Sequence, residues 1–351
     1  MSTEARRHRV AGALATDALL VSTLFNVRYL TGFTGSNAAV LLERDGGGVL
    51  FTDGRYRDQA AAECPDLEVV VRRDLPAAVA ERVTGRSVAV ETHTMSVDAH
   101  ARWRDLHVGP TEPAGRPVER ARETKDDAEI AALRRACAIS VEALAGLLDG
   151  PLVGRSEREV ARDLENRMLD LGAEAVGFDT ICAAGENSAI PHHAPTARRL
   201  GTGDLLKIDF GARVDGYHAD ITRTMVLGPA ADWQREVHGA VRQAQALGVA
   251  ALVEGAEVAA VDAAVRADLA SSGQLEHFTT GLGHGVGLQI HEDPFFAATH
   301  PGRLTDRTVL TMEPGVYLAG RGGVRIEDTV CVTPGAPEVL TPAPTELLEI
   351  G

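Results

Sequence analysis

Five side chains of metal-binding types recur along the second half of the chain, each inside a short, glycine-punctuated segment with the character of a strand. In order they are Asp209, Asp220, His284, Glu313 and Glu327. Carboxylate oxygens and an imidazole nitrogen suit divalent cations, and four carboxylates with one histidine hold two such ions if two carboxylates bridge them. Two ions roughly 3.5–4 Å apart form a hydrolytic site. This order of residues therefore predicts a fold that brings the five segments together.

Two of these acids belong to a predicted hairpin. The segments with the composition of strands are residues 205–210 and 219–226. Between them Asp215-Gly216 is the signal for a tight two-residue turn. Such a turn sets Asp209 opposite Thr222, and position 220 has the same parity as 222. Asp209 and Asp220 are therefore expected on one face, where acids beside apolar neighbours are costly unless they are paired or bind metal.

Length and composition indicate two domains. The 351 residues exceed the usual size of one hydrophobic core, and 44% of them are hydrophobic, enough to fill two. The stretch 109–117, rich in proline and glycine, is the candidate linker, so we place domains at 1–115 and 116–351. Short strands at 38–42 and 87–90 alternate with Ala/Arg-rich helical stretches. This alternation predicts a small α/β N-terminal domain.

The second domain is expected to begin with a long helix, capped by residues 124–127 and running to about Asp149. Its apolar positions are Ile130, Leu133, Ile139, Leu144 and Leu147. Further helices are predicted near 157–171, 232–252 and 258–272, interleaved with the strand segments that carry the acids. The chain as a whole is therefore predicted to be α+β.

Several classes of protein are disfavoured by composition. A net charge of -15, without a dense Lys/Arg cluster, argues against a nucleic-acid partner or an anionic membrane. No apolar run reaches the length of about 18 residues that spans a bilayer, and the N-terminus has no secretory core. We therefore expect a cytoplasmic protein. Its four cysteines are far apart, form no Cys-x-x-Cys pair and are expected to be reduced, buried thiols.

A run of glycines surrounds His284, at positions 281, 283, 285 and 287. Glycines also occur in phosphate-binding loops, but no Lys-Ser or Lys-Thr follows here, and the spacing does not match a dinucleotide fingerprint. Close backbone packing around His284 is the simpler interpretation.

The motifs that carry these residues resemble those of the pita-bread metallopeptidases, and more narrowly the prolidase and aminopeptidase P branch. The matching segments are 208–211, 216–224, 283–288, 312–315 and 325–328. Residues 29–36 and 51–56 resemble the N-terminal domain of the same branch. The resemblance implies an N-terminal creatinase-like α/β domain followed by a pita-bread catalytic domain.

The resemblance also implies roles for the five residues. Asp209 would chelate one ion, Asp220 and Glu327 would bridge, and His284 with Glu313 would complete the second site. Two divalent ions per subunit follow, with manganese first and cobalt, zinc or iron as alternatives, because a carboxylate-rich site with one histidine suits all of them.

Four further residues are carried over as site candidates. His192 and His291 match positions where the family places groups that contact substrate and shuttle protons, a task that suits imidazole. Spacing alone does not distinguish His192 from His193, and we choose His192 because the family motif is Pro-His. Arg325 shares a strand face with Glu327 and could pair with carboxylates, including that of a substrate. Tyr317 matches a position that is often tyrosine in relatives, although a core tyrosine explains it equally well.

One position departs from the family pattern. Four residues before His284, where many relatives carry a histidine that lines the substrate pocket, this chain has Thr280. The departure puts in doubt the substrate contacts of this loop, although not metal binding.

The implied reaction is hydrolysis of Xaa-Pro bonds in small proline-containing peptides. A hydroxide that bridges the two ions would be the nucleophile, Glu313 the general acid and base, and His192 and His291 would orient the intermediate. We expect an Xaa-Pro dipeptidase (prolidase) first and an Xaa-Pro aminopeptidase acting on longer peptides as the alternative. A non-peptidase relative, such as an amidinohydrolase or a binding protein, is disfavoured because all five ligands are present. A homodimer is also implied.

Overall fold

The computed structural model describes residues 1–296 and 302–351 and divides the chain into two compact units, Met1–Arg122 and Glu123–Gly351. The boundary that we place after residue 115 lies just before helix α6 (Pro117–Glu123), at the junction of the units. In the described part of the chain, no helix is long and apolar enough to cross a membrane. All four cysteines are free and buried.

The N-terminal unit is built on a six-stranded sheet of order β4-β3-β2-β1-β5-β6. Its strands are β1 (Ala18–Val21), β2 (Ala38–Glu43), β3 (Gly48–Thr52), β4 (Glu68–Val71), β5 (Val88–Val90) and β6 (Thr111–Pro113). Its other helices are α1 (Thr3–Ala11), α2 (Leu24–Thr31), α3 (Arg57–Glu63), α4 (Leu75–Arg82) and α5 (Val97–Leu106), with a 3-10 turn η1 (Gly54–Tyr56). β2 pairs antiparallel with β1 and β3, whereas β4, β5 and β6 join in parallel. The expected α/β domain is therefore present.

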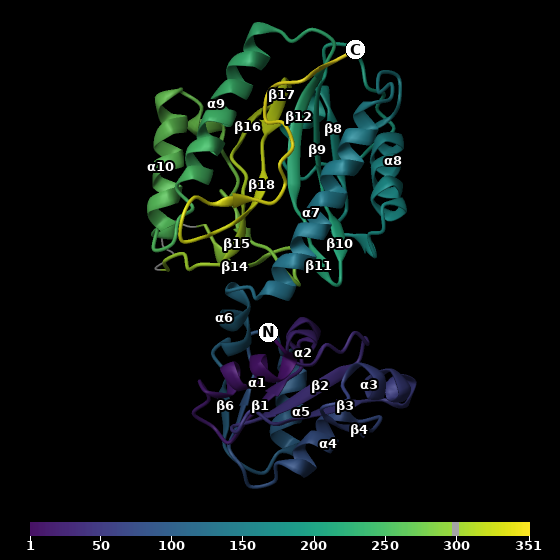
Figure 1. Ribbon diagram of the computed structural model, residues 1–351, viewed down its shortest axis with the longest axis vertical. Coiled ribbons are helices and arrows are strands. Elements are labelled where there is room, and N and C mark those ends of the chain that lie inside the picture. Colours follow the sequence, from purple (N-terminus) through teal and green to yellow (C-terminus); the bar gives the residue numbers. More distant parts are fainter. Residues whose placement is uncertain (297–301) are drawn as a thin grey trace. The chain divides into compact units, whose positions relative to one another are not determined.

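The C-terminal unit contains two helix pairs and several curved sheets (Figure 1). Its helices are α7 (Asp127–Leu148), α8 (Glu157–Asp170), α9 (Asp232–Ala250) and α10 (Val258–Ser271), with 3-10 turns η2 (Gly185–Ala189) and η3 (Leu275–His277). One sheet has the order β20-β12-β9-β8, with β8 (Ile181–Ala184), β9 (Leu205–Phe210), β12 (Ile221–Leu227) and β20 (Glu349–Ile350). A second has the order β14-β13-β15-β18-β19, with β13 (His284–Gly285), β14 (Glu292–Phe295), β15 (Val309–Met312), β18 (Asp328–Cys331) and β19 (Glu338–Val339). Smaller sheets join β7 (Ala175–Val176), β10 (Ala212–Val214) and β11 (Tyr217–His218), and β16 (Gly315–Leu318) with β17 (Gly322–Arg325).

Each helix pair covers its own part of the sheets. Apolar side chains of α7 and α8 form one core with those of β8, β9 and β12. Those of α9 and α10 form another core with residues of β15 to β18. Burial of apolar side chains in these two layers contributes most of the favourable free energy of folding. The layers leave the strand ends that carry the acids between them.

Helix α7 confirms the predicted long helix, and its start explains why. The Asp126 side chain accepts hydrogen bonds from the backbone of Ala128 and Glu129 at 2.9 and 3.1 Å, and Glu129 accepts from the backbone N–H of Asp126 at 2.9 Å. This reciprocal capping box satisfies donors that a helix start leaves free. Leu133 and Leu147 are fully buried, and each such side chain stabilises the fold by about 1.5–3 kcal/mol.

The predicted hairpin is also confirmed. Asp215 and Gly216 have φ angles of 50° and 82°, the left-handed pair that a type I′ turn requires. β9 and β12 pair antiparallel, with Asp209 directly opposite Thr222. Asp220 lies immediately before β12 and two residues before Thr222. It is therefore a diagonal neighbour of Asp209 on the same face of the hairpin. The turn sequence therefore determines which two acids become neighbours.

Candidate metal centre

The five residues predicted as ligands line one cavity of about 640 Å³ in the C-terminal unit. Each stands at or beside a strand end: Asp209 in β9, Asp220 before β12, His284 at the start of β13, Glu313 after β15, and Glu327 between β17 and β18. The backbone N–H of Glu327 donates to the carbonyl of Thr222 at 3.1 Å, which fixes Glu327 beside the hairpin. The convergence that the sequence predicts is present in the structure.

The ligand atoms of Asp220, His284 and Glu327 lie within 4.8 Å of one another. His284 Nε2 lies 3.5 Å from Asp220 Oδ2 and 3.5 Å from Glu313 Oε1. Asp209 Oδ1 is buried and has no hydrogen-bond partner among the described residues. A buried carboxylate oxygen without a donor is costly, so this atom fits a cation as its missing partner.

His284 is held in the form that binds metal. Its Nδ1 lies 3.1 Å from the Gly285 carbonyl, so the ring donates there and presents the Nε2 lone pair to the carboxylates. Burial and the neighbouring His291 lower the pKa of His284 to about 4, which keeps the ring neutral near pH 7. A neutral imidazole with a free Nε2 is the form that a divalent ion requires.

The glycines around His284 allow close packing of the backbone. A Cβ at Gly283, where φ is +154°, would lie 2.2 Å from the Thr311 carbonyl oxygen, and one at Gly285 would lie 2.3 Å from that of Asp293. No side chain fits at those distances. This observation supports the packing interpretation of the glycine run over a phosphate loop.

Like charges are concentrated in the cavity. Burial, Glu327 and Asp209 raise the pKa of Asp220 well above its usual range, and burial with Glu313 does the same for Glu327. Burial also raises the pKa of Glu313 to about 7. Buried carboxylates that repel one another need protons or cations to be stable. The donor set is therefore suited to divalent ions.

Arg325 and Tyr317 lie behind the cluster and are not among the described residues that line the cavity. Arg325 forms an ion pair with Asp209 and donates to Thr222 Oγ1 at 3.0 Å and to the Tyr317 hydroxyl at 2.7 Å. Thr222 in turn donates to Glu327 Oε2 at 2.7 Å. Arg325 thus orients carboxylates of the cluster and Tyr317 contacts Arg325, while the contact of either residue with substrate stays a prediction.

His192, His193 and His291 all border the cavity, but their contacts differ. The ring of His291 packs edge to face against that of His284, with the two ring centroids 4.4 Å apart. His193 also borders the cavity, but its side chain is buried and its Nε2 lies 2.9 Å from Glu157 Oε2, so its ring is held by a structural contact. Thr280 is not among the described residues at the cavity wall.

Several residues of the cavity wall were not identified from the sequence. Helix α8 contributes Arg158, Arg162 and Glu165, which are spaced as one helical face. Lys207 lies nearby, fully buried, and donates from Nζ to the carbonyls of Ile190 and Pro191 at 2.7 and 3.2 Å. Lys207 could have been identified from the sequence, because it lies inside the apolar strand β9 and a buried lysine needs a specific partner.

Comparisons with known proteins agree with this site. Residues 131–334 match metallopeptidase family M24, and residues 6–124 match the creatinase/prolidase N-terminal domain. An Xaa-Pro dipeptidase of Pyrococcus furiosus is 33% identical over 95% of this chain and 95% of its own length. An uncharacterized peptidase of Bacillus subtilis is 34% identical over 96% of this chain and 97% of its own.

Solved structures are similar over the full length. An Xaa-Pro dipeptidase from Bacillus anthracis superposes with a TM-score of 0.94 at 33% identity, covering 99% of both chains. An X-Pro aminopeptidase from Thermotoga maritima gives 0.88 at 32% identity, covering 97% of this chain and 100% of that one. A creatinase-type N-terminal domain followed by a pita-bread domain with a buried carboxylate–imidazole cluster defines a metallopeptidase. The chain belongs to metallopeptidase family M24.

Proposed function

We propose that this metallopeptidase binds two divalent ions and hydrolyses Xaa-Pro dipeptides. The observation that carries the proposal is the convergence of four carboxylates and one neutral imidazole, with Asp209 Oδ1 left without a donor in the described part of the chain. Asp209, Asp220 and Glu327 would hold one ion, and Asp220, Glu327, His284 and Glu313 the other. When bound, the ions would lower the pKa of water and polarise the scissile carbonyl.

The side chains of the cavity supply the remaining steps. Glu313 would take a proton from the attacking water and deliver it to the leaving nitrogen. His192 and His291, on the cavity wall, would donate hydrogen bonds to the tetrahedral intermediate. An Xaa-Pro bond is a tertiary amide without an N–H, so a pocket shaped for the proline ring would select it.

The preferred peptide length has two candidates. Xaa-Pro dipeptidases of two Pyrococcus species are similar to this chain at 33% and 39% identity, which supports a dipeptidase. The Thermotoga X-Pro aminopeptidase is covered over its full length, so chain length does not separate the two activities. The aminopeptidase therefore remains the second candidate.

A substrate panel tests this proposal. With manganese-loaded protein we expect kcat/KM for Ala-Pro to exceed that for Ala-Pro-Ala and for Ala-Ala by about ten-fold or more, since the carboxylate and ring of proline would be recognised together. Products are measured by chromatography. Faster cleavage of Ala-Pro-Ala would assign an aminopeptidase instead, and cleavage of Ala-Ala at the same rate would contradict proline selectivity.

Three further features belong to this proposal. We infer manganese as the working ion, a homodimer in solution and residence in the cytoplasm. The carboxylate-rich donor set favours manganese, while cobalt, zinc and iron fit the same ligands. A gel-filtration mass of one chain would contradict the dimer.

A further inference from the structure

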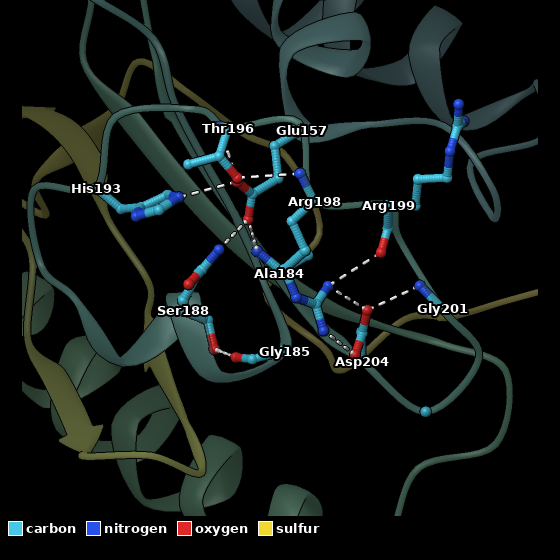
Figure 2. Close-up of polar contacts among 12 residues, drawn as sticks. Glu157, Ala184, Gly185, Ser188, His193, Thr196, Arg198, Arg199, Gly201 and Asp204 are labelled. Atoms are coloured by element: carbon cyan, nitrogen blue, oxygen red, sulfur yellow. Dashed lines mark hydrogen bonds and ion pairs between the residues drawn. The ribbon is translucent and has the colours of Figure 1, made fainter.

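A buried carboxylate lies at the start of helix α8, outside the metal cluster. Glu157 is the first residue of α8, and its side chain is completely buried. Oε1 accepts from the backbone N–H of Ala184 and from Asn187 Nδ2, each at 2.9 Å. Oε2 accepts from the backbone N–H and hydroxyl of Thr196, at 2.9 and 2.6 Å, and lies 2.9 Å from His193 Nε2 (Figure 2).

These donors lie on both sides of His192 in the sequence. Ala184 and Asn187 precede His192, whereas His193 and Thr196 follow it. The backbone reinforces the second group, because the N–H of Glu157 donates to the Arg198 carbonyl at 3.0 Å. One carboxylate therefore anchors both ends of the segment that presents His192 to the cavity.

The carbonyls immediately before His192 are fixed from the opposite side. Lys207 Nζ donates to Ile190 and Pro191, and Arg325 Nη1 donates to Pro191 at 3.3 Å. His192 itself is exposed and lines the cavity. Its backbone is thus restrained, while its ring remains open to a ligand.

Packing alone does not account for a charge at this position. A buried carboxylate is costly, and an apolar side chain of similar size fills a core at lower cost. Burial would raise the pKa of Glu157, but hydrogen bonds from Thr196, Asn187, Ala184 and His193 outweigh it and lower the pKa to about 2. The group is therefore a permanent acceptor whose directional bonds determine the geometry of the segment.

We propose that Glu157 is a positioning residue for the reaction, which fixes His192 at the cavity wall by holding both flanks of its segment and the ring of His193. This inference rests on the proposed function, because it takes His192 to act on the substrate. Glu157 would act through His192 and would not touch the substrate itself.

A double-mutant cycle tests this role. Glu157→Gln keeps the shape but places an amide group against donors, so we expect kcat to fall by about ten-fold or more with KM changed less than about two-fold. In a His192→Ala background the same substitution should change kcat less than about two-fold, since the residue it positions is gone. An equal loss in both backgrounds, or no loss in the wild-type background, would overturn the proposal.

Glu159→Gln is the matched control. Glu159 lies in the same first turn and accepts from the backbone N–H of Ser156 at 2.7 Å, but it makes none of the contacts to the His192 segment. The Glu159→Gln substitution should lower the melting temperature slightly and leave kcat within about two-fold in both backgrounds. If Glu157→Gln does not fold, Thr196→Val is the milder substitution, because it removes only one donor to Glu157. It should also lower kcat in the wild-type background and leave kcat nearly unchanged in the His192→Ala background.

Hydrogen exchange provides a readout that does not depend on activity. The backbone amides of residues 185–196 should exchange faster in Glu157→Gln and remain unchanged in Glu159→Gln. If the wild-type protein cleaves no Xaa-Pro peptide, the proposed function fails, while this exchange result still tests the anchoring. Unchanged exchange in Glu157→Gln would contradict the anchoring by itself.

Discussion

Glu313→Gln is expected to lower kcat for an Xaa-Pro dipeptide by roughly 10²- to 10⁴-fold while leaving the fold intact. Glutamine keeps the size of the side chain and one oxygen that could bind an ion, but it cannot take up a proton. Glu313 Oε1 lies 3.5 Å from His284 Nε2, whose ring is neutral near pH 7, and 3.4 Å from Thr311 Oγ1, so the substitution breaks no ion pair with either neighbour. Steady-state kinetics and thermal unfolding of the same preparation measure both effects.

Metal content must be measured alongside, because Glu313 is also a proposed ligand. Bound metal close to that of the wild type, together with the loss of turnover, would assign the defect to proton transfer. Turnover within about ten-fold of the wild type would contradict the role proposed for Glu313.

Asp220→Asn is expected to have opposite effects on the metal-free and metal-loaded proteins. Without metal, burial and the neighbouring Glu327 disfavour the ionised form of Asp220, so asparagine, which has no charge to bury and no proton to retain, should stabilise the protein by about 1–3 kcal/mol. With metal, the same change removes a proposed bridging ligand, so bound metal and the stabilisation that metal provides should both fall. Hydrolysis should decrease by more than about a hundred-fold.

The effect in the metal-free protein should depend on pH. The pKa of Asp220 is higher in the folded chain than in the unfolded chain, so the folded state retains a proton that the unfolded state has lost. Stability of the metal-free wild type should therefore fall as pH rises above about 4, and the gain from Asp220→Asn should grow in the same range. Unfolding by denaturant at several pH values, with and without manganese, measures this.

Asp204→Asn serves as the control for this experiment. Asp204 pairs with Arg198 through both carboxylate oxygens, at 2.7 and 2.9 Å, away from the cluster. Its replacement should destabilise the protein with or without metal. If Asp220→Asn also destabilised the metal-free protein, the carboxylates would not be in conflict there, and a central element of the metal-site account would be wrong.

Features set by local sequence were predictable. The hairpin register follows from Asp215-Gly216 because a two-residue turn leaves one pairing of the flanking strands. Helix α7 follows from its capping residues and apolar spacing. The convergence of Asp209 and Asp220 was therefore accessible from the sequence, whereas that of His284, Glu313 and Glu327 came from resemblance to a known family.

Features set by distant residues were not predictable in the same way. His192 and His193 are adjacent in the sequence. They differ because His193 contacts Glu157, which lies 36 positions before it at the start of α8. Arg325 shares the expected strand but reaches back to Asp209, and Lys207 reaches the carbonyls of a loop. No local pattern determines which of two neighbouring side chains a buried partner selects.

Titration of the chelated protein with manganese tests the central claim most directly. Bound metal per chain and hydrolysis of Ala-Pro would be recorded in the same samples. The account predicts no hydrolysis in the metal-free protein, saturation at two ions per chain, and recovery of activity as the sites fill, with a gain in stability of about 2.7 kcal/mol from each independent site at a hundred-fold excess over its Kd. Full hydrolysis without bound metal, or saturation at fewer than two ions per chain, would contradict it.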